Sequence, residues 1–252
     1  MRIEEVIKSW ELTAAFNGQW YGIFINPFYI TRRQIFEAVR DFANTISSDA
    51  VVLDVGCGMK PYRSLWKTKH YIGIDVKGGG LKDQAKKADK YFDGQNIPYT
   101  AKKFDVVIAT EVLEHVEFPE KLLQEVQRVL KPKGKLFLTM PFVWPEHGIP
   151  FDFQRYTSFK HRKILSKCGF KTLSVKSTTG AFGTCGQVLS DFIYAELSGW
   201  IWRSGFPYGM NFILVRLVTF IFLFPIQLIF EILDTIFKRK GITLDFVVIA
   251  EK

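Results

Sequence analysis

The chain has 252 residues, of which 48% are hydrophobic and 23% are charged, and its formal net charge is +9 at pH 7. This length suits one well-buried α/β domain with an appendage and disfavours two full domains. Its three cysteines, Cys57, Cys168 and Cys185, lack the spacing of a disulfide framework or a metal site, which indicates a reducing compartment. The positive charge indicates a polyanionic neighbour, either nucleic acid or an anionic membrane face.

Residues 1–50 are expected to form a helical N-terminal cap. The first residues, Met1 to Glu5, contain no apolar core of a signal peptide, so we expect the catalytic part to be cytoplasmic. A helix is predicted from Thr31, its N-cap, to Ile46, with a stripe of apolar residues at Ile35, Val39, Phe42 and Ile46. An aromatic cluster precedes it and either packs in the interior, which we favour, or covers a substrate pocket. This cluster consists of Trp20, Tyr21, Phe24, Phe28 and Tyr29.

The segment from Val51 to Gly58 is predicted to be a buried strand followed by a tight turn that approaches a ligand. Gly56 and Gly58 permit unusual backbone angles and allow a ligand to lie on the main chain, although an ordinary strand-to-loop turn has the same pattern. The third glycine of the dinucleotide fingerprint is missing, which disfavours a nicotinamide or flavin cofactor. A second strand, His70 to Asp75, ends in an acid where Rossmann-like sheets bind ribose hydroxyls. The two strand ends together predict a nucleoside pocket.

The pattern of strands and helices continues to about residue 180. A lysine-rich segment up to Lys90 is interpreted as a mobile loop and a solvated face. Further strands are predicted at 90–92, 104–109, 135–140 and 170–177, with helices at 119–130 and from Thr157 to Cys168. This alternation predicts a doubly wound, mostly parallel α/β sheet.

Six short motifs follow one another along the chain in a recognisable order. They are Val51–Gly58, Ile74–Asp75, Asp93 with Ile97–Tyr99, Phe104–Val107, Glu111–Val116 and Arg128–Gly134. In order and spacing they resemble the class I S-adenosylmethionine-dependent methyltransferases, especially the small-molecule group that includes the ubiquinone-type enzymes and bacterial enzymes of glycan and lipid pathways. The resemblance covers about residues 50–180, and Lys133 departs from it at a position where the family usually has glycine.

The resemblance implies a Rossmann-like sheet with an antiparallel last strand, and S-adenosylmethionine as the cofactor. It implies that Asp54, Gly56 and Gly58 hold the methionine end, Asp75 the ribose hydroxyls and Asp93 the adenine amino group, with Thr110 and Glu111 near the sulfonium. The cofactor is a cation without phosphate, so carboxylates are favourable and a third glycine is unnecessary. No metal site is expected.

The loop at 141–157 is the predicted acceptor site, because it follows the carboxyl end of a strand. His147 is the leading candidate for a general base and Asp152 the second. Alternatively, His147 only supports the loop and Asp152 pairs with Arg155 as a structural clamp. The candidate substrate-binding residues are Trp144, Arg155 and Tyr156, whereas His115 is interpreted as a structural residue at a helix start.

Residues 181–240 are predicted to be an apolar helical insertion, which divides the methyltransferase core into residues 51–180 and 241–252. The stretch from Phe212 to Phe230 is almost wholly apolar and long enough to span a bilayer. Because a last strand at 242–250 returns the chain to the cytoplasmic sheet, we expect a re-entrant or surface-lying hairpin that bends at Pro225. Residues 200–240 would contact the membrane, with Trp200, Trp202 and Tyr208 near the headgroups and Arg203, Lys238, Arg239 and Lys240 facing anionic lipid. The alternative is a soluble lid whose apolar face packs on the sheet or on a second subunit.

These features predict a methyltransferase, peripheral or monotopic on the inner face of the membrane. Its acceptor would be small or lipid-linked, with the methyl group going to an oxygen of a saccharide, glycolipid or isoprenoid intermediate. An RNA methyltransferase is the main rival within enzymes, but nucleic acid is not the expected partner because no separate RNA-binding module is visible. A non-catalytic membrane adaptor with the same fold is the third possibility.

Overall fold

The structure, a computed structural model, describes residues 18–78, 83–237 and 241–252. By its internal contacts the chain divides into two compact units. The sheet unit comprises residues 38–177 and 245–252, and the hairpin unit comprises residues 1–37 and 178–244. Each unit is described by itself below.

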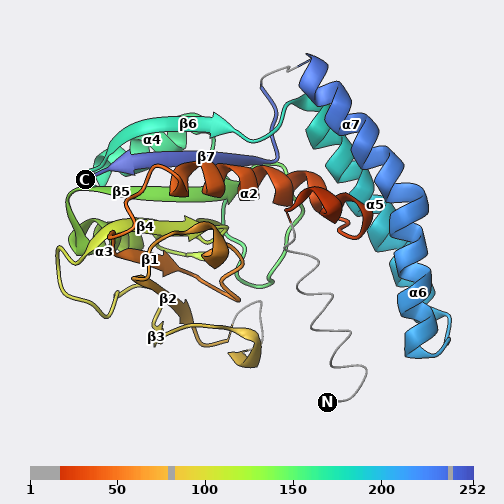
Figure 1. The fold of residues 1–252 in the computed structure, drawn as a ribbon, viewed down its shortest axis with the longest axis horizontal. Helices are drawn as coiled ribbons and strands as arrows, with labels where there is room; N and C mark the ends of the chain where they lie inside the picture. The colour runs from red at the N-terminus through yellow and green to blue at the C-terminus, as the bar shows by residue number, and fades with distance from the viewer. Residues whose placement is uncertain (1–17, 79–82, 238–240) are drawn as a thin grey trace. The chain divides into compact units, whose positions relative to one another are not determined.

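The sheet unit contains a seven-stranded sheet in the order β3-β2-β1-β4-β5-β7-β6 (Figure 1). Its strands are β1 (Val52–Val55), β2 (Tyr71–Val76), β3 (Lys90–Phe92), β4 (Phe104–Thr110), β5 (Leu130–Pro141), β6 (Lys171–Ser177) and β7 (Asp245–Glu251). The first five strands pair in parallel, whereas β7 is antiparallel to both β5 and β6. The predicted Rossmann-like sheet with an antiparallel last strand is confirmed.

Helices α3 (Pro119–Val129) and α4 (Ser158–Lys167) cover one face of this sheet. Helix α3 starts with a proline in its first turn, and α4 is capped by the Thr157 hydroxyl, which accepts a hydrogen bond from Lys160 N at 3.3 Å. Leucine and valine side chains of α3 pack against alternate residues of β1 and β5 in one continuous core. The short 3₁₀ segments of the unit are η2 (Arg63–Leu65), η3 (Asp83–Ala85) and η4 (Leu113–His115).

Aromatic residues fill the opposite face. Phe42, in the last turn of helix α2 (Tyr29–Ala43), stacks on Phe137 of β5 at 5.0 Å between ring centroids. Trp66 packs edge-on against Phe42 at 6.1 Å and lies 6.0 Å from the ring of Tyr71. Both faces of the central strands are therefore buried, as expected for apolar strands in a parallel sheet.

Helix α2 begins earlier than the sequence indicated. It starts at Tyr29 rather than after a Thr31 cap, and the backbone N–H of Thr31 donates to Gln187 Oε1 at 3.4 Å. Asn26 supplies a side-chain acceptor before the helix, where Oδ1 binds Phe28 N at 2.8 Å. The predicted apolar stripe is correct at Ile35, Val39 and Phe42, which are all buried.

The hairpin unit contains two long helical segments. They comprise α5 (Ala181–Arg203) on one side and α6 (Tyr208–Val218), the π-helical turn η5 (Thr219–Leu223) and α7 (Phe224–Phe237) on the other. The chain reverses at residues 204–207, so the predicted bend at Pro225 is wrong. A π-helical turn directly precedes Pro225 and keeps the helix continuous from Tyr208 to Phe237.

Polar side chains from the helices of the hairpin unit bind the backbone just before α2. The amides of Gln187 and Gln227 both donate to the carbonyl of Pro27 at 2.9 Å, and Arg216 donates to the carbonyl of Ile25 at 2.6 Å. These bonds satisfy buried carbonyl groups that lie outside regular structure. These bonds link the residues just before α2 to the insertion, with which residues 18–37 group by their contacts.

The last strand begins at Asp245, three residues later than the predicted 242–250. Thr243 instead serves the loop: its hydroxyl oxygen accepts hydrogen bonds from the backbone N–H groups of Thr178 and Thr179 at 3.0 and 3.1 Å. Leu244 N in turn donates to Thr179 Oγ1 at 3.0 Å. A threonine that binds neighbouring backbone in this way competes with strand pairing.

We expect Gly186→Ala and Gly199→Ala, both in α5, to have opposite effects on stability. A Cβ at Gly186 would overlap Phe230 Cβ of α7, whereas at Gly199 the nearest atoms belong to the end of the Arg203 side chain at 3.7 Å. Alanine in an open helical position stabilises by up to about 1 kcal/mol, so Gly199→Ala should raise the melting temperature and Gly186→Ala should lower it. Thermal unfolding in detergent, followed by circular dichroism, measures both. Equal shifts for the two variants would contradict the close packing of α5 on α7.

Candidate active site

The turn after β1 has the backbone geometry that only glycine adopts easily. Gly56 and Gly58 have φ angles of +69° and +48°, and the N–H groups of Gly56 and Cys57 donate to the carbonyl of Ile74 at 2.9 and 3.0 Å. A Cβ at Gly56 would lie 2.5 Å from Cγ2 of Val112. The turn is thus held against β2, and its glycine is required sterically as well as by its backbone angle.

Asp75, at the end of β2, closes this turn. Its Oδ2 accepts a hydrogen bond from Gly58 N at 2.8 Å, and its Oδ1 accepts one from Val76 N at 2.8 Å. The ammonium of Lys86 lies 3.1 Å from Asp75 Oδ1 and also donates to the carbonyls of Val76 and Gly78. The side chain of Lys86 is buried, so the prediction that this lysine-rich segment is wholly a solvated face was wrong for this residue.

Asp54 lies in β1 below the glycine turn and is buried. Its Oδ2 accepts a hydrogen bond from the hydroxyl of Tyr71 at 2.6 Å. Burial, with a smaller contribution from the nearby charge of Asp75, raises the pKa of Asp54 to about 7. Burial, together with these two acids, also raises the pKa of the Cys57 thiol to about 12. Cys57 is therefore a protonated packing residue and no nucleophile at neutral pH.

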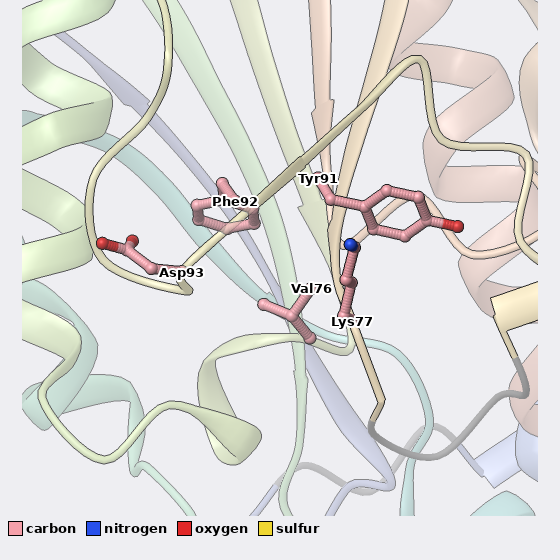
Figure 2. A pocket seen from close by; sticks show the side chains of 5 residues that line it. All are labelled: Val76, Lys77, Tyr91, Phe92 and Asp93. Carbon is pink, nitrogen blue, oxygen red and sulfur yellow. The ribbon is translucent and has the colours of Figure 1, made fainter.

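An open hollow of about 410 Å³ lies at the ends of β2 and β3 (Figure 2). Its lining residues are Val76, Lys77, Tyr91, Phe92 and Asp93. Asp93 accepts hydrogen bonds from the backbone N–H groups of Gln95 and Asn96 at 2.8 and 2.6 Å, and these bonds lower its pKa. The hollow combines aromatic and aliphatic walls with a carboxylate at its rim, a composition suited to a purine base.

These features fit S-adenosylmethionine. The cofactor carries positive charge at its sulfonium and amino groups, and the site has carboxylates at Asp54, Asp75 and Asp93. Gly56 and Gly58 have the left-handed backbone angles that the turn requires, and the hollow next to Asp93 has the position expected for adenine. In this arrangement Asp75 and Lys86 would both border the ribose.

Glu111 follows the end of β4 in a left-handed backbone conformation, with φ of +56°. Its Oε1 accepts a hydrogen bond from the Thr139 hydroxyl at 2.7 Å, and its N–H donates to the same residue's carbonyl at 3.2 Å. Thr110 pairs in register with Thr139 and is half-buried. A non-glycine residue in this conformation stores backbone strain and is characteristic of functional sites.

The loop after β5 contains the predicted clamp. Arg155 binds Asp152 with both terminal nitrogens, at 2.5 and 2.8 Å, and this bond lowers the pKa of Asp152 to about 2. Such a carboxylate is too weak a base to take a proton at neutral pH, so Asp152 is a structural and orienting residue rather than a second base. Asp152 Oδ2 also accepts the backbone N–H of His147 at 3.0 Å.

His147 remains the candidate base. Its Nδ1 lies 3.2 Å from the carbonyl of Pro145 and 3.3 Å from Asp152 Oδ2. Burial lowers the pKa of His147, so its imidazole is neutral at pH 7. Because two acceptors face Nδ1, the proton resides there and Nε2 presents a lone pair.

Glu114 and His115 belong to the same cluster and were missed as functional residues. Glu114 has 0% exposure, and within residues 18–78, 83–237 and 241–252 neither of its carboxylate oxygens has a hydrogen-bond partner. Burial and the charge of Glu111 raise its pKa well above the usual range. His115 lies in the short helix η4, as expected for a helix-start residue, and its ring also lies 4.8 Å from the His147 ring, edge to face. The only hint in the sequence was an acid followed by histidine just after β4.

The predicted substrate-binding residues separate into two groups. Trp144 and Arg155 are half-buried in the loop, and the terminal nitrogens of Arg155 are engaged by Asp152. Tyr156, in contrast, is buried in the core, and its hydroxyl donates to Gln154 Oε1 at 2.7 Å. Its phenol supports Gln154, whose amide binds the carbonyls of Leu113 and Val116, so we withdraw Tyr156 as a substrate contact.

Comparison with known proteins agrees with this geometry. Residues 53–138 match a family model described as a methyltransferase domain. The uncharacterized protein MJ1123 of Methanocaldococcus jannaschii is 32% identical over 143 residues, which cover 50% of this chain and 67% of that protein. The chain belongs to the S-adenosylmethionine-dependent methyltransferases.

Two further similarities concern characterised proteins. The tRNA (carboxymethyluridine(34)-5-O)-methyltransferase of Arabidopsis thaliana is 30% identical to this methyltransferase over 125 residues, which cover 48% of this chain but only 31% of the plant enzyme. Phosphoethanolamine N-methyltransferase 2 of Haemonchus contortus, solved with S-adenosyl-L-methionine, superposes with a TM-score of 0.54 at 18% identity and covers 86% of this chain and 52% of that one. The second similarity shows the fold alone. S-adenosylmethionine is the cofactor of the family.

We expect this methyltransferase to bind S-adenosylmethionine about tenfold more weakly at about pH 6 than at about pH 8. Asp54 has a pKa of about 7, and a cationic ligand favours its charged form. Affinity should therefore rise with pH through this pKa and level off above it. Isothermal titration calorimetry across this range measures the effect. Asp54→Asn should bind weakly at every pH and lose the pH dependence, whereas a wild-type affinity that is flat with pH would contradict a role for Asp54.

Proposed function

We propose that this protein transfers the methyl group of S-adenosylmethionine to an oxygen atom of a small or lipid-linked acceptor at the inner face of a membrane. The acceptor would be a saccharide, glycolipid or isoprenoid intermediate. The observation that carries the membrane part of this proposal is the distribution of side chains in the hairpin unit.

The hairpin unit buries polar side chains and exposes apolar ones. Its fully or almost fully buried polar residues include Thr184, Gln187, Ser190, Asn211, Thr219 and Gln227. Its exposed apolar residues include Ile213, Phe220, Ile221, Phe222, Ile229, Ile232, Ile236 and Phe237. A protein surrounded by water has the opposite arrangement, so a large apolar surface of this kind favours lipid as the surrounding medium.

Helix packing in this unit supports the same conclusion. Small residues of α5 allow close approach to α7: a Cβ at Gly183 would lie 2.9 Å from Asp234 Oδ2, and one at Gly186 would overlap Phe230. Small residues at helix contacts are characteristic of helices that associate within lipid. The segment Tyr208–Phe237 is, by length and composition, capable of crossing a membrane.

The topology of the sheet unit places both connections to the insertion at one edge. The chain leaves the sheet after Ser177 and returns at Asp245, which pairs with Pro141 at the end of β5. This is the carboxyl edge of the parallel strands, where the glycine turn and the loop of His147 also lie. An insertion that starts and ends at this edge favours an acceptor supplied through the lipid-facing element.

An oxygen acceptor suits the chemistry of His147. Hydroxyl and carboxylic acid groups must give up a proton to become nucleophiles, and a neutral imidazole can accept it. The methyl group is transferred by in-line displacement, whose barrier falls mainly through alignment of the two reactants. The Asp152–Arg155 pair orients His147 for this task. Asp152 Oδ2 accepts the backbone N–H of His147 and lies 3.3 Å from Nδ1 of the same residue.

RNA is the second candidate acceptor. It is favoured by the net charge of +9 and by the tRNA methyltransferase among the similar proteins. That similarity covers less than a third of the plant enzyme, and the apolar surface of the hairpin unit has no use in binding a polyanion.

A transfer assay with purified full-length protein separates these candidates. Isotope-labelled S-adenosylmethionine is supplied with a total lipid extract, with a soluble saccharide fraction or with total RNA. We expect label in the lipid extract, and at least tenfold less there for His147→Gln, with unchanged affinity for S-adenosylmethionine. Label in RNA alone would overturn the acceptor class, and cofactor binding without transfer to any fraction would identify a non-catalytic adaptor.

Membrane association is tested by flotation with liposomes that contain anionic phospholipid. The double variant Ile229→Glu/Ile232→Glu adds charge to the exposed face of α7 and should reduce the bound fraction at least tenfold. The matched control is Phe159→Glu, an equally drastic change at an exposed phenylalanine of the sheet unit. Wild-type protein that remains soluble without detergent and does not float would contradict the membrane proposal.

A further inference from the structure

The most unusual group in the sheet unit is the carboxylate of Glu114. It is completely buried, yet in the part of the chain that the structure describes neither Oε1 nor Oε2 has a hydrogen-bond partner. Buried carboxylates are normally paired with a cation or fully hydrogen-bonded, because desolvation strongly disfavours an isolated charge. Asp245 and Glu111 add negative charge nearby, while Arg155 is the cationic group that faces Glu114 from the neighbouring loop. Arg155 is already bound to Asp152, so Glu114 lacks a partner of its own.

Two imidazoles point at this carboxylate. His115 Nε2 lies 3.6 Å and His147 Nε2 lies 4.0 Å from Glu114 Oε1. His115 Nδ1 is 2.6 Å from the carbonyl oxygen of Phe151, and a carbonyl can only accept, so this nitrogen carries the proton. The Nε2 of His115 consequently directs a lone pair toward Glu114.

His147 has the same arrangement. Its Nδ1 faces the carbonyl of Pro145 at 3.2 Å and Asp152 Oδ2 at 3.3 Å, which leaves Nε2 unprotonated. Histidines that bind metals typically donate their other ring N–H to a carbonyl or a carboxylate, which sets the tautomer and orients the ring. Both histidines already have this outer partner.

We propose that Glu114, His115 and His147 bind a divalent transition-metal ion. Their ligand atoms lie within 4.8 Å of one another, and the two distances to Glu114 Oε1 are within about 1 Å of the ~3.3 Å that separates ligands in tetrahedral zinc sites. Two imidazoles and one carboxylate suit Zn²⁺, Co²⁺ or Mn²⁺ better than Mg²⁺, which prefers oxygen ligands and keeps its waters. Three protein ligands leave a position open, as in catalytic metal sites.

The role of this ion rests on the proposed methyl transfer, although its binding does not. An acceptor oxygen in the open position would lose its proton to water, because a metal ion lowers the pKa of a bound hydroxyl. The oxygen's electron pair would then form the bond to the methyl carbon while the electrons of the methyl–sulfur bond return to sulfur. In the metal-bound protein His147 is therefore a ligand, and the ion performs the activation otherwise assigned to its imidazole.

No metal site was expected from the sequence. Glu114 and His115 are adjacent after β4, but His147 lies in the loop after β5, so no spacing motif joins them. Gly148 allows the approach of the two segments: a Cβ there would lie 3.1 Å from Cε1 of His115, and its φ of +64° also disfavours other residues.

Metal binding is measured on the tag-free full-length protein without cofactor or acceptor. After chelation and dialysis, the protein is titrated with Co²⁺ and with Zn²⁺, and the bound ion is followed by the Co²⁺ absorption spectrum and by elemental analysis. We expect one ion per chain and a spectrum typical of nitrogen ligation in fewer than six positions. Absence of binding, or a purely hexaaquo spectrum, would overturn the site.

Substitutions test which side chains bind the ion. Glu114→Gln keeps the volume and removes the charge, so it should fold but bind Co²⁺ at least tenfold more weakly, as should His147→Asn. The matched controls are Glu117→Gln, Glu146→Gln and His70→Asn, which change exposed residues near or outside the cluster and should bind like the wild type. Binding that is equal in all five variants would identify only an adventitious surface ion.

A second measurement controls for misfolding of the variants. Zn²⁺ should raise the melting temperature of the wild type and of the controls, but not that of Glu114→Gln, whose metal-free form should be at least as stable as the metal-free wild type. Transfer activity distinguishes the two proposals. If the chelated protein binds no metal and still methylates, the metal role is lost and His147 stands as the base; if metal binds but no acceptor is methylated, the proposed function fails while the site stands.

Discussion

The parallel pairing of β1 with both β2 and β4 is the constraint on which the site depends. Val52 pairs in register with Tyr71 on one side and with Val106 on the other, so the carboxyl ends of these strands meet at one edge. The glycine turn, Asp75 and Glu111 consequently become neighbours although they are far apart in the chain. Val112, just after β4, fills the space beneath Gly56 and couples the two ends sterically.

Two of the buried carboxylates at this edge, those of Asp54 and Glu114, have different environments. Asp54 retains one donor, the Tyr71 hydroxyl, and its pKa of about 7 lets it ionise when a cation arrives. Glu114 has no donor and faces two imidazole lone pairs instead. Burial disfavours both charges, so a nearby cation would stabilise each of them. The expected cation is the charged cofactor at Asp54 and the proposed metal ion at Glu114. In this proposal the site stabilises positive charge at two places, at the cofactor and at the metal ion.

The hairpin unit follows a different physical rule. Its glutamine, threonine and asparagine side chains are buried and bind backbone carbonyls, whereas its isoleucine and phenylalanine side chains are exposed. In water these exposed apolar side chains would gain nothing from the hydrophobic effect. In lipid the same distribution is favourable. Polar groups must form hydrogen bonds inside the protein, whereas apolar side chains can face the lipid tails. The chain therefore joins an α/β enzyme fold to a unit whose exposed apolar side chains support the proposed contact with a membrane.

Local patterns in the sequence were sufficient for the elements that depend on periodicity and turn chemistry. The valine-rich run before Gly56, the Pro119 helix start and the Thr157 cap each specify structure through their own neighbours, so the strands, helices and strand-end acids were predicted correctly. The starts of α2 and β7 could not be predicted, because Gln187 and Thr243 bind backbone groups that are far away in the chain. The bend was misplaced at Pro225 because the π-helical turn η5 keeps the helix continuous there. The same limit applies to the site. Asp54, Gly56 and Asp75 were recognisable because they lie at the ends of their own strands, and the Asp152–Arg155 pair because its two residues are close in the chain. The cluster of Glu114, His115 and His147, in contrast, exists only where folding brings the loops after β4 and β5 together.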